Sequence, residues 1–256
     1  MKKIYLVVLV LLIGCSSDSV DSSDETPVII ETGLKDLATS KGKFIGNLMR
    51  DGFFDNHDIY NGAIDNILKT EYNALVTGNK LKMVNLLRDR PEDPFNIKIS
   101  DLNTYNIDRF VNYANKHNMK KRGHVMIWYK QIPNWLDEES KTWTSQQIYD
   151  FTESYIRALS RYTNGKIDEW DVLNEAIVFN GYRSNTWYEK VNNQENDNGE
   201  IGYLSYFSKL FKWAREENPD VKLFYNDYGI EEYGTSKNNL MLSLIHISEP
   251  TRQFAI

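Results

Sequence analysis

The stretch of sequence that decides the fold is Trp170-Asp171-Val172-Leu173-Asn174-Glu175-Ala176, which reads WDVLNEA. It begins with a short, mostly apolar run and continues into two polar residues, Asn174 and Glu175. Short apolar runs without polar alternation are typical of parallel strands that are covered on both faces. We therefore expect a buried strand that delivers Asn174 and Glu175 to one edge of a sheet.

The same pattern recurs on both sides of this stretch. Four further apolar runs are found at Lys43–Met49, Asn73–Thr77, Gly123–Trp128 and Val221–Tyr225. Apolar stripes at helical spacing lie between the runs, at Ile64/Ile67/Leu68, Ile107/Phe110/Val111/Ala114, Ile148/Phe151/Tyr155/Leu159/Tyr162 and Leu204/Phe207/Phe211/Ala214. A Thr144-x-x-Gln147 capping box opens the third helix, and Pro219 stops the fourth. Strands that alternate with helices predict βα units and a parallel sheet.

Polar residues follow each run: Asn47, Gly78-Asn79, Tyr129-Lys130-Gln131, Asn174-Glu175 and Asn226-Asp227. The carboxyl ends of the strands build the active site in a (β/α)8 barrel, and a doubly wound sheet binds ligands at the same edge. The chain contains neither a G-x-G-x-x-G turn nor a Walker motif, which disfavours nucleotide binding. We therefore expect an α/β fold, a (β/α)8 TIM barrel of which about the first five βα units are present.

Composition narrows the classes of function. The net charge of −6 and the pI of about 5.4 argue against a nucleic-acid footprint. The single cysteine excludes a disulfide framework and a cysteine-based zinc site.

A second informative segment is Arg122–Trp135, which reads RGHVMIWYKQIPNW and places His124, Trp128 and Gln131 on or just beyond one strand. Indole faces stack on sugar rings, while imidazole and amide groups hydrogen-bond hydroxyls. A carboxyl group at Glu175 suits protonation of a glycosidic oxygen. Each side chain alone also has an ordinary structural reading, as a core or solvated residue. Their coincidence at one sheet edge favours a carbohydrate site.

The chain from about Phe44 to Glu231 resembles glycoside hydrolase family 10, whose typical member is a retaining endo-β-1,4-xylanase on a (β/α)8 barrel. The family's strand-four motif, W-D-V-x-N-E-A, is intact. Its strand-three motif matches at Arg122, Gly123, His124, Trp128, Gln131, Pro133 and Trp135. Two further segments, Leu223–Tyr228 and Tyr72–Lys82, resemble the family's strands five and two.

The resemblance implies roles for individual residues. Glu175 is the general acid/base, and the substrate-binding residues are Asn79, Lys82, His124, Trp128, Gln131 and Asn174. The family's strand-two Asn and Lys hold xylose units on the non-reducing side. The implied partner is xylan or a related β-glycan, with no nucleic acid and with no metal or organic cofactor.

Two positions depart from the family pattern. Tyr129 stands where the family usually has a second histidine, and Gly78 stands where strand two usually offers a glutamate. Both positions help to line the non-reducing-side subsites, so the departures bear on which glycan is bound. Asp227 is open to two interpretations, as a site residue or as a structural turn residue.

The length of the chain raises a further expectation. A retaining glycosidase needs a second carboxyl group as nucleophile, which this family carries in an I-T-E-L-D-like run at the end of strand seven. No such run occurs here. The five strands begin on average about 45 residues apart, and 31 residues follow Tyr225. We expect a partial catalytic domain over residues 33–241 that is inactive and folds poorly by itself. Turnover of xylan by this chain would contradict this expectation.

Both ends of the chain carry their own interpretations. Residues 1–14 resemble a bacterial lipoprotein signal peptide that ends before Cys15, the expected lipidation site, and residues 15–32 form a Ser/Asp-rich tether. This predicts a lipid-anchored protein of the bacterial cell envelope, at the outer membrane or cell surface, which meets the membrane only through the anchor. Residues 242–256 resemble a translated sequencing adapter and are interpreted as a non-native tail. A native stop codon at this end in a resequenced locus would contradict that reading.

Two alternatives to a xylanase remain at this stage. One is a surface glycan-binding lipoprotein on a decayed barrel, motivated by Tyr129 and Gly78 and disfavoured by the intact Asn174-Glu175 pair. The other is a hydrolase of a different β-linked glycan. The strand-seven residue of the longer gene separates an enzyme from a binder, and product analysis separates the substrates.

Overall fold

The computed structural model describes residues 33–52, 62–179, 181–193, 202–232, 234 and 237. The interpretations of residues 1–14, Cys15, residues 15–32 and residues 242–256 therefore lie outside the described residues. Within the described part, no helix is both long and apolar enough to cross a bilayer.

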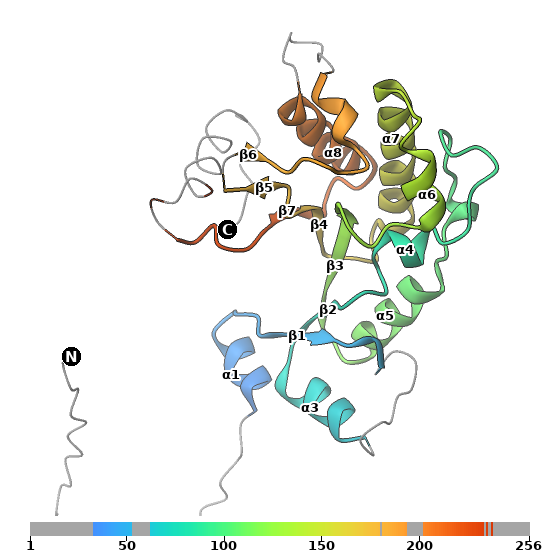
Figure 1. The fold of residues 1–256 in the computed structure, drawn as a ribbon. Coiled ribbons are helices and arrows are strands. Elements are labelled where there is room, and N and C mark those ends of the chain that lie inside the picture. The colour runs from blue at the N-terminus through green and yellow to red at the C-terminus, as the bar shows by residue number, and fades with distance from the viewer. Residues whose placement is uncertain are drawn as a thin grey trace, which may run out of the picture. The chain divides into compact units, whose positions relative to one another are not determined.

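Five parallel strands form the main sheet (Figure 1). They are β1 (Gly46–Met49), β2 (Ala74–Thr77), β3 (Lys120–Ile127), β4 (Glu169–Asn174) and β7 (Lys222–Asn226). Each strand pairs in parallel with the next one along the chain. A doubly wound sheet reverses its strand order at a switch point, whereas here spatial order follows chain order, as in a barrel wall. The five predicted strands and the partial (β/α)8 architecture are confirmed.

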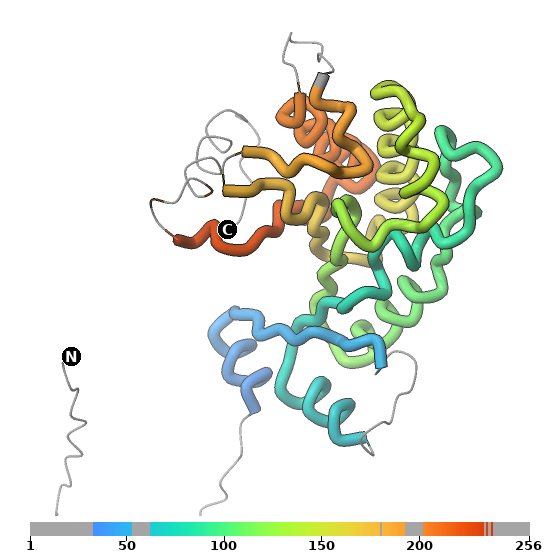
Figure 2. The backbone as a smooth tube through the Cα atoms, in the orientation of Figure 1, coloured from blue at the N-terminus to red at the C-terminus, as the bar shows by residue number. Residues whose placement is uncertain are grey.

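One helix precedes the first strand, and the others lie in the connections between strands. The helices are α1 (Leu34–Ser40), α3 (Ala63–Glu71), α4 (Met83–Leu86), α5 (Tyr105–Lys116), α6 (Asn134–Glu139), α7 (Ser145–Thr163) and α8 (Tyr203–Glu217), with 3-10 turns at Ile99–Asp101 and Glu189–Asn193. A short antiparallel hairpin, β5 (Ile177–Val178) and β6 (Gly181–Tyr182), follows β4. The tube in Figure 2 shows this hairpin leading from β4 towards α8, while α5, α7 and α8 lie on one side of the strands.

Helix α7 shows how the sequence sets an element's start and its buried face. The Thr144 hydroxyl accepts from the Gln147 backbone N–H at 3.2 Å, and the Gln147 side chain accepts from the Thr144 N–H at 2.8 Å. The predicted capping box is thus confirmed. The predicted stripe is buried from Ile148 to Leu159, and Tyr162 at its end is half-buried.

Three expectations need correction: the buried face of α8, the buried face of α3 and the position of Asn47. On α8, the buried face centres on Tyr206, Leu210 and Trp213, whereas Leu204 is only half-buried, because large aromatic side chains reach the core from positions beside the predicted stripe. On α3, Leu68 is buried but Ile64 and Ile67 are exposed. Asn47 lies inside β1 rather than after it.

The contact between β3 and β4 depends on one glycine. Gly123 is the register partner of Trp170, whose indole is 0% exposed. A Cβ atom at position 123 would lie 2.4 Å from the Trp170 ring. The indole Nε1 also donates to Thr163 Oγ1 at the end of α7, at 3.2 Å. Trp170 therefore packs over Gly123 and ties the sheet to the helix layer.

Candidate active site

The site is built on the residue that follows β4. Glu175 has a φ of +53°, a left-handed conformation that is uncommon for a non-glycine residue. Two hydrogen bonds hold this conformation: the Glu175 N–H donates to the Asn226 carbonyl at 2.9 Å, and Arg183 Nε donates to the Glu175 carbonyl at 2.8 Å. The backbone of Glu175 is thus fixed from β7 on one side and from the segment after β6 on the other.

The Glu175 carboxylate contacts two predicted site residues. Trp128 Nε1 donates to one carboxylate oxygen at 3.3 Å, and the Asn174 amide reaches the other at 3.4 Å. The Asn174 amide is itself held by the Asn226 amide at 2.7 Å, and the Trp187 indole donates to the Trp128 carbonyl at 2.9 Å. The indole of Trp128 is therefore fixed at its backbone and its N–H points to the carboxylate.

Three more predicted residues join this group from β2 and the segment after β3. Lys82 Nζ donates to Asn79 Oδ1 at 2.9 Å, and Gln131 Nε2 donates to the same oxygen at 3.2 Å. The Lys82 ammonium also lies 4.6 Å from the centre of the Trp128 ring. Lys82 is 8% exposed, and its burial lowers its pKa, while the charges of Asp51 and Glu175 act in the opposite direction.

Asp51 also belongs to this group, although no motif in the sequence points to it. It follows β1 by two residues, and its carboxylate accepts from the Asn79 backbone N–H at 3.1 Å and from Asn79 Nδ2 at 2.7 Å. One feature of the sequence could have pointed to Asp51 as a site residue. It is an acidic residue just beyond the first apolar run, and polar residues also follow the other apolar runs.

His124 lies inside β3 and belongs to a separate ion-paired cluster. Its Nδ1 is 2.9 Å from an Asp171 carboxylate oxygen, and Arg122 binds the other oxygen of Asp171 through Nε at 3.1 Å and through Nη2. The Asp171 side chain is 3% exposed. A buried carboxylate with two cationic or donor partners fixes the ring of His124 and leaves Nε2 as its other polar atom. The structure thus places His124 with Asp171 rather than in the group around Glu175.

The two departures from the family pattern have local explanations. The Tyr129 ring packs beneath the Arg183 guanidinium, 4.0 Å from the ring centre, so Tyr129 supports the residue that holds the Glu175 carbonyl. Gly78 lies beside a neighbouring carboxylate, since a Cβ there would be in ordinary contact with Asp51 Oδ1, at 3.5 Å.

Asp227 and Trp135 are both held by neighbouring groups of the protein, which indicates a structural role for each. Asp227 accepts hydrogen bonds from Tyr225 and the Tyr228 N–H and pairs with Lys237, and its side chain is fully buried. This favours its structural reading. Trp135 donates to the Leu87 carbonyl at 3.2 Å and packs edge-on against Phe151, so it supports the core instead of offering a face to a sugar.

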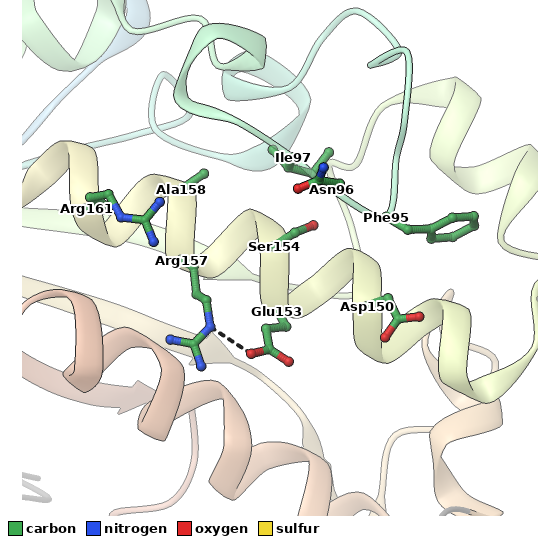
Figure 3. A pocket seen from close by; sticks show the side chains of 9 residues that line it. All are labelled: Phe95, Asn96, Ile97, Asp150, Glu153, Ser154, Arg157, Ala158 and Arg161. Carbon is green, nitrogen blue, oxygen red and sulfur yellow. Dashed lines mark hydrogen bonds and ion pairs between the residues drawn. The ribbon is translucent and has the colours of Figure 1, made fainter.

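A cavity of about 340 Å³ lies elsewhere, between α7 and the loop at Phe95–Ile97 (Figure 3). Arg157 in its wall pairs with Glu153, Glu216 and Glu217. A hydrogen bond from Arg161 lowers the pKa of Glu217. These charges are satisfied across α7 and α8, and none of the lining residues belongs to the Glu175 group.

Comparison with known proteins gives consistent results. Residues 33–249 match the sequence model of glycosyl hydrolase family 10. Endo-1,4-beta-xylanase B of Thermotoga neapolitana is 29% identical over 241 residues, which cover 93% of this chain and 59% of that protein. The chain thus spans about three-fifths of the length of this relative.

Solved structures show the same likeness. Xylanase 10B from Thermotoga petrophila in complex with xylobiose has a TM-score of 0.69 at 28% identity, covering 83% of this chain and 58% of that one. Native xylanase 10B from Thermotoga maritima has a TM-score of 0.69 at 27% identity, covering 86% and 61%.

Proposed function

This chain belongs to glycosyl hydrolase family 10, and from that premise we propose that it is an endo-1,4-β-xylanase that hydrolyses internal β-1,4-xylosidic bonds of xylan with retention. The observation that carries the proposal is the placement of Glu175 at the end of β4, with Trp128 and Asn174 on its carboxylate. Lys82 lies over the Trp128 ring and donates to Asn79. Glu175 therefore lies at one end of a row of side chains of the kinds that bind sugars.

In this mechanism Glu175 has two successive tasks. It first donates a proton to the glycosidic oxygen while a second carboxylate attacks the anomeric carbon. It then takes a proton from the water that releases the sugar from the covalent intermediate. The Trp128 contact orients the carboxylate for both steps, because the indole N–H donates to one of its oxygens, while the Asn174 amide lies beside the other.

The nucleophile is the remaining requirement. Among the described residues, the hydrogen-bond partners of the Glu175 carboxylate are Trp128 and Asn174, and neither is a carboxylate. The family's I-T-E-L-D-like run has no counterpart in the 256 residues. Activity is therefore to be measured on the full gene product, which is the longest polypeptide that the gene encodes.

Incubation of the full gene product with xylan is expected to release xylo-oligosaccharides, with the new reducing ends first appearing as β anomers by NMR. A parallel incubation with β-1,4-glucan is the matched control, on which we expect much slower release. Hydrolysis of another β-glycan but not of xylan would contradict the assignment of xylan as the substrate. Xylan binding without any hydrolysis would favour a glycan-binding protein on the same barrel.

Arg183 is expected to act as a positioning residue for Glu175. Arg183→Met removes the donor to the Glu175 carbonyl and the cation over Tyr129. We expect kcat on xylan to fall about 10-fold, the effect of one charge-assisted hydrogen bond. On 2,4-dinitrophenyl β-xylobioside, whose leaving group needs no proton, the first chemical step is expected to change less than about 3-fold.

The controls for Arg183 are a conservative variant and a surface variant. Arg183→Lys keeps a cation and is expected to retain part of the activity, whereas Arg88→Met, at an exposed arginine, is expected to have no effect. Equal losses by Arg183→Met on both substrates would show that the residue supports the fold generally and not the orientation of the acid.

A further inference from the structure

The ends of β1 and β2 lie side by side because the two strands pair in register from Gly46 with Ala74 to Met49 with Thr77. The pairing continues one step further, where the Gly78 N–H donates to the Met49 carbonyl at 3.1 Å. Asp51 then reaches across to the end of β2 and binds Asn79 through both carboxylate oxygens. A residue from β1 is thereby held against a predicted sugar-binding residue of β2.

Gly78 lies directly beside this approach. A Cβ atom at position 78 would have Asp51 Oδ1 as its nearest neighbour, at 3.5 Å, and the Met49 carbonyl next, at 3.7 Å. A longer side chain at this position would have to share its surroundings with the Asp51 carboxylate. The position at which the resemblance leads one to expect a glutamate thus lacks a side chain, and a carboxylate from the neighbouring strand lies beside it.

The Asp51 carboxylate retains the capacity to bind more than Asn79. An ionised carboxylate has about four acceptor positions, and Asn79 occupies two of them. The residue is half-buried rather than enclosed. Beside it stand the Asn79 amide and the Lys82 ammonium, and Lys82 lies over the Trp128 ring. A carboxylate, an ammonium and an indole together are suited to neighbouring hydroxyls on a sugar ring.

We propose that Asp51 is a sugar-binding carboxylate of the active site, delivered from β1 into the space beside Gly78, where it accepts hydrogen bonds from hydroxyls of a xylose unit on the non-reducing side of the cleaved bond. This assignment rests on the proposed xylanase function.

The test compares two substrates with the same leaving group. Aryl β-xylobioside places one more sugar on the non-reducing side than aryl β-xyloside does. For Asp51→Ala in the full gene product, kcat/KM on the xylobioside is expected to fall about 10- to 100-fold, as for the loss of a hydrogen bond to a charged group. On the xyloside it is expected to change less than about 3-fold. Asp51→Asn, which keeps the volume, is expected to show the same selective loss to a smaller extent.

A second-site variant separates sugar contact from mere support of Asn79. Gly78→Glu restores a carboxylate from β2 in place of the one from β1. In the Asp51→Ala background it is expected to recover at least about 5-fold of the lost kcat/KM on the xylobioside, whereas in the unmodified protein it is expected to lower activity because two carboxylates then compete for one space. Asp89→Ala, at an 84% exposed aspartate, is the matched surface control.

The outcomes are distinguishable. If the unmodified protein hydrolyses neither substrate, both the proposed function and this assignment are wrong. If it hydrolyses both and the Asp51 variants lose activity equally on the two substrates, or lose none, the assignment alone is wrong. The same conclusion follows if Gly78→Glu has the same effect in both backgrounds.

Discussion

Glu175→Ala in the full gene product is expected to lower kcat on xylan by about 10²- to 10⁴-fold, the usual contribution of a general acid/base. The physical reason is that the xylan leaving group is a sugar hydroxyl, which departs slowly unless the glycosidic oxygen is protonated. The carboxyl of Glu175 is held for that task by the Trp128 indole N–H, which donates to it at 3.3 Å. The measurement is steady-state release of reducing sugar.

Two further readouts identify the step that is lost. On 2,4-dinitrophenyl β-xylobioside the leaving group needs no proton, so the variant is expected to form the covalent intermediate readily and to stall at its hydrolysis. Added azide attacks that intermediate without help from a base, and we expect it to accelerate turnover and to yield a β-xylosyl azide product. Equal losses on both substrates without an azide effect would refute the acid/base role.

The matched control is Glu231→Gln. Glu231 is an exposed carboxylate in the segment that follows β7, at the same end of the sheet. Its loss is expected to leave kcat on xylan unchanged. A large effect there would show that the activity responds to the charge of this end of the barrel rather than to one acid.

The second large effect is on stability. Gly123→Ala places a methyl group 2.4 Å from the buried Trp170 ring, a rigid neighbour that is anchored to Thr163. In the full gene product we expect a loss of about 3 kcal/mol in the free energy of unfolding, at the upper end of typical overpacking costs. For a domain of this size that corresponds to a fall of roughly 6–12 °C in the midpoint of thermal unfolding.

Gly46→Ala is the control for this substitution on a nearby strand. A Cβ atom there would lie at an ordinary 3.5 Å from Ala74, so we expect a change within about 0.5 kcal/mol. Combining Gly123→Ala with Trp170→Phe is expected to cost less than the sum of the two single changes, because the smaller ring vacates part of the contested space. A Gly123→Ala protein as stable as its parent would contradict the packing argument.

The sequence predicts elements well where one physical pattern repeats over a long enough stretch. The five strands were found because each is a short apolar run, and α7 because its stripe and its Thr144–Gln147 capping box agree. Short elements such as α4, with four residues, and the β5–β6 hairpin, with two-residue strands, were not predicted. They span too few residues for a periodicity to appear.

Site residues were likewise predictable only where a local sequence pattern marks them. Motif residues such as Glu175 and Trp128 could be predicted because they follow buried runs directly, and the structure brings them into contact. Asp51 could not, because its position depends on the register between β1 and β2 and on its bonds to Asn79. The structural surroundings of Trp135 were equally hidden, since its sequence neighbours do not reveal the Leu87 carbonyl to which it donates.

The strand pairings also bear on how the chain reaches its native state. Every pairing in the main sheet joins segments far apart in the sequence, from Gly46 with Ala74 to Arg122 with Glu169. Before such parallel pairings can form, the chain must lose the conformational entropy of the long loops between the strands. This makes folding slow compared with that of helical bundles. During synthesis at about 5–20 residues per second, β2 would wait several seconds before its next partner, β3, emerges. The order of the sheet therefore leaves one edge of β2 unpaired during that interval, a state that favours association with other chains.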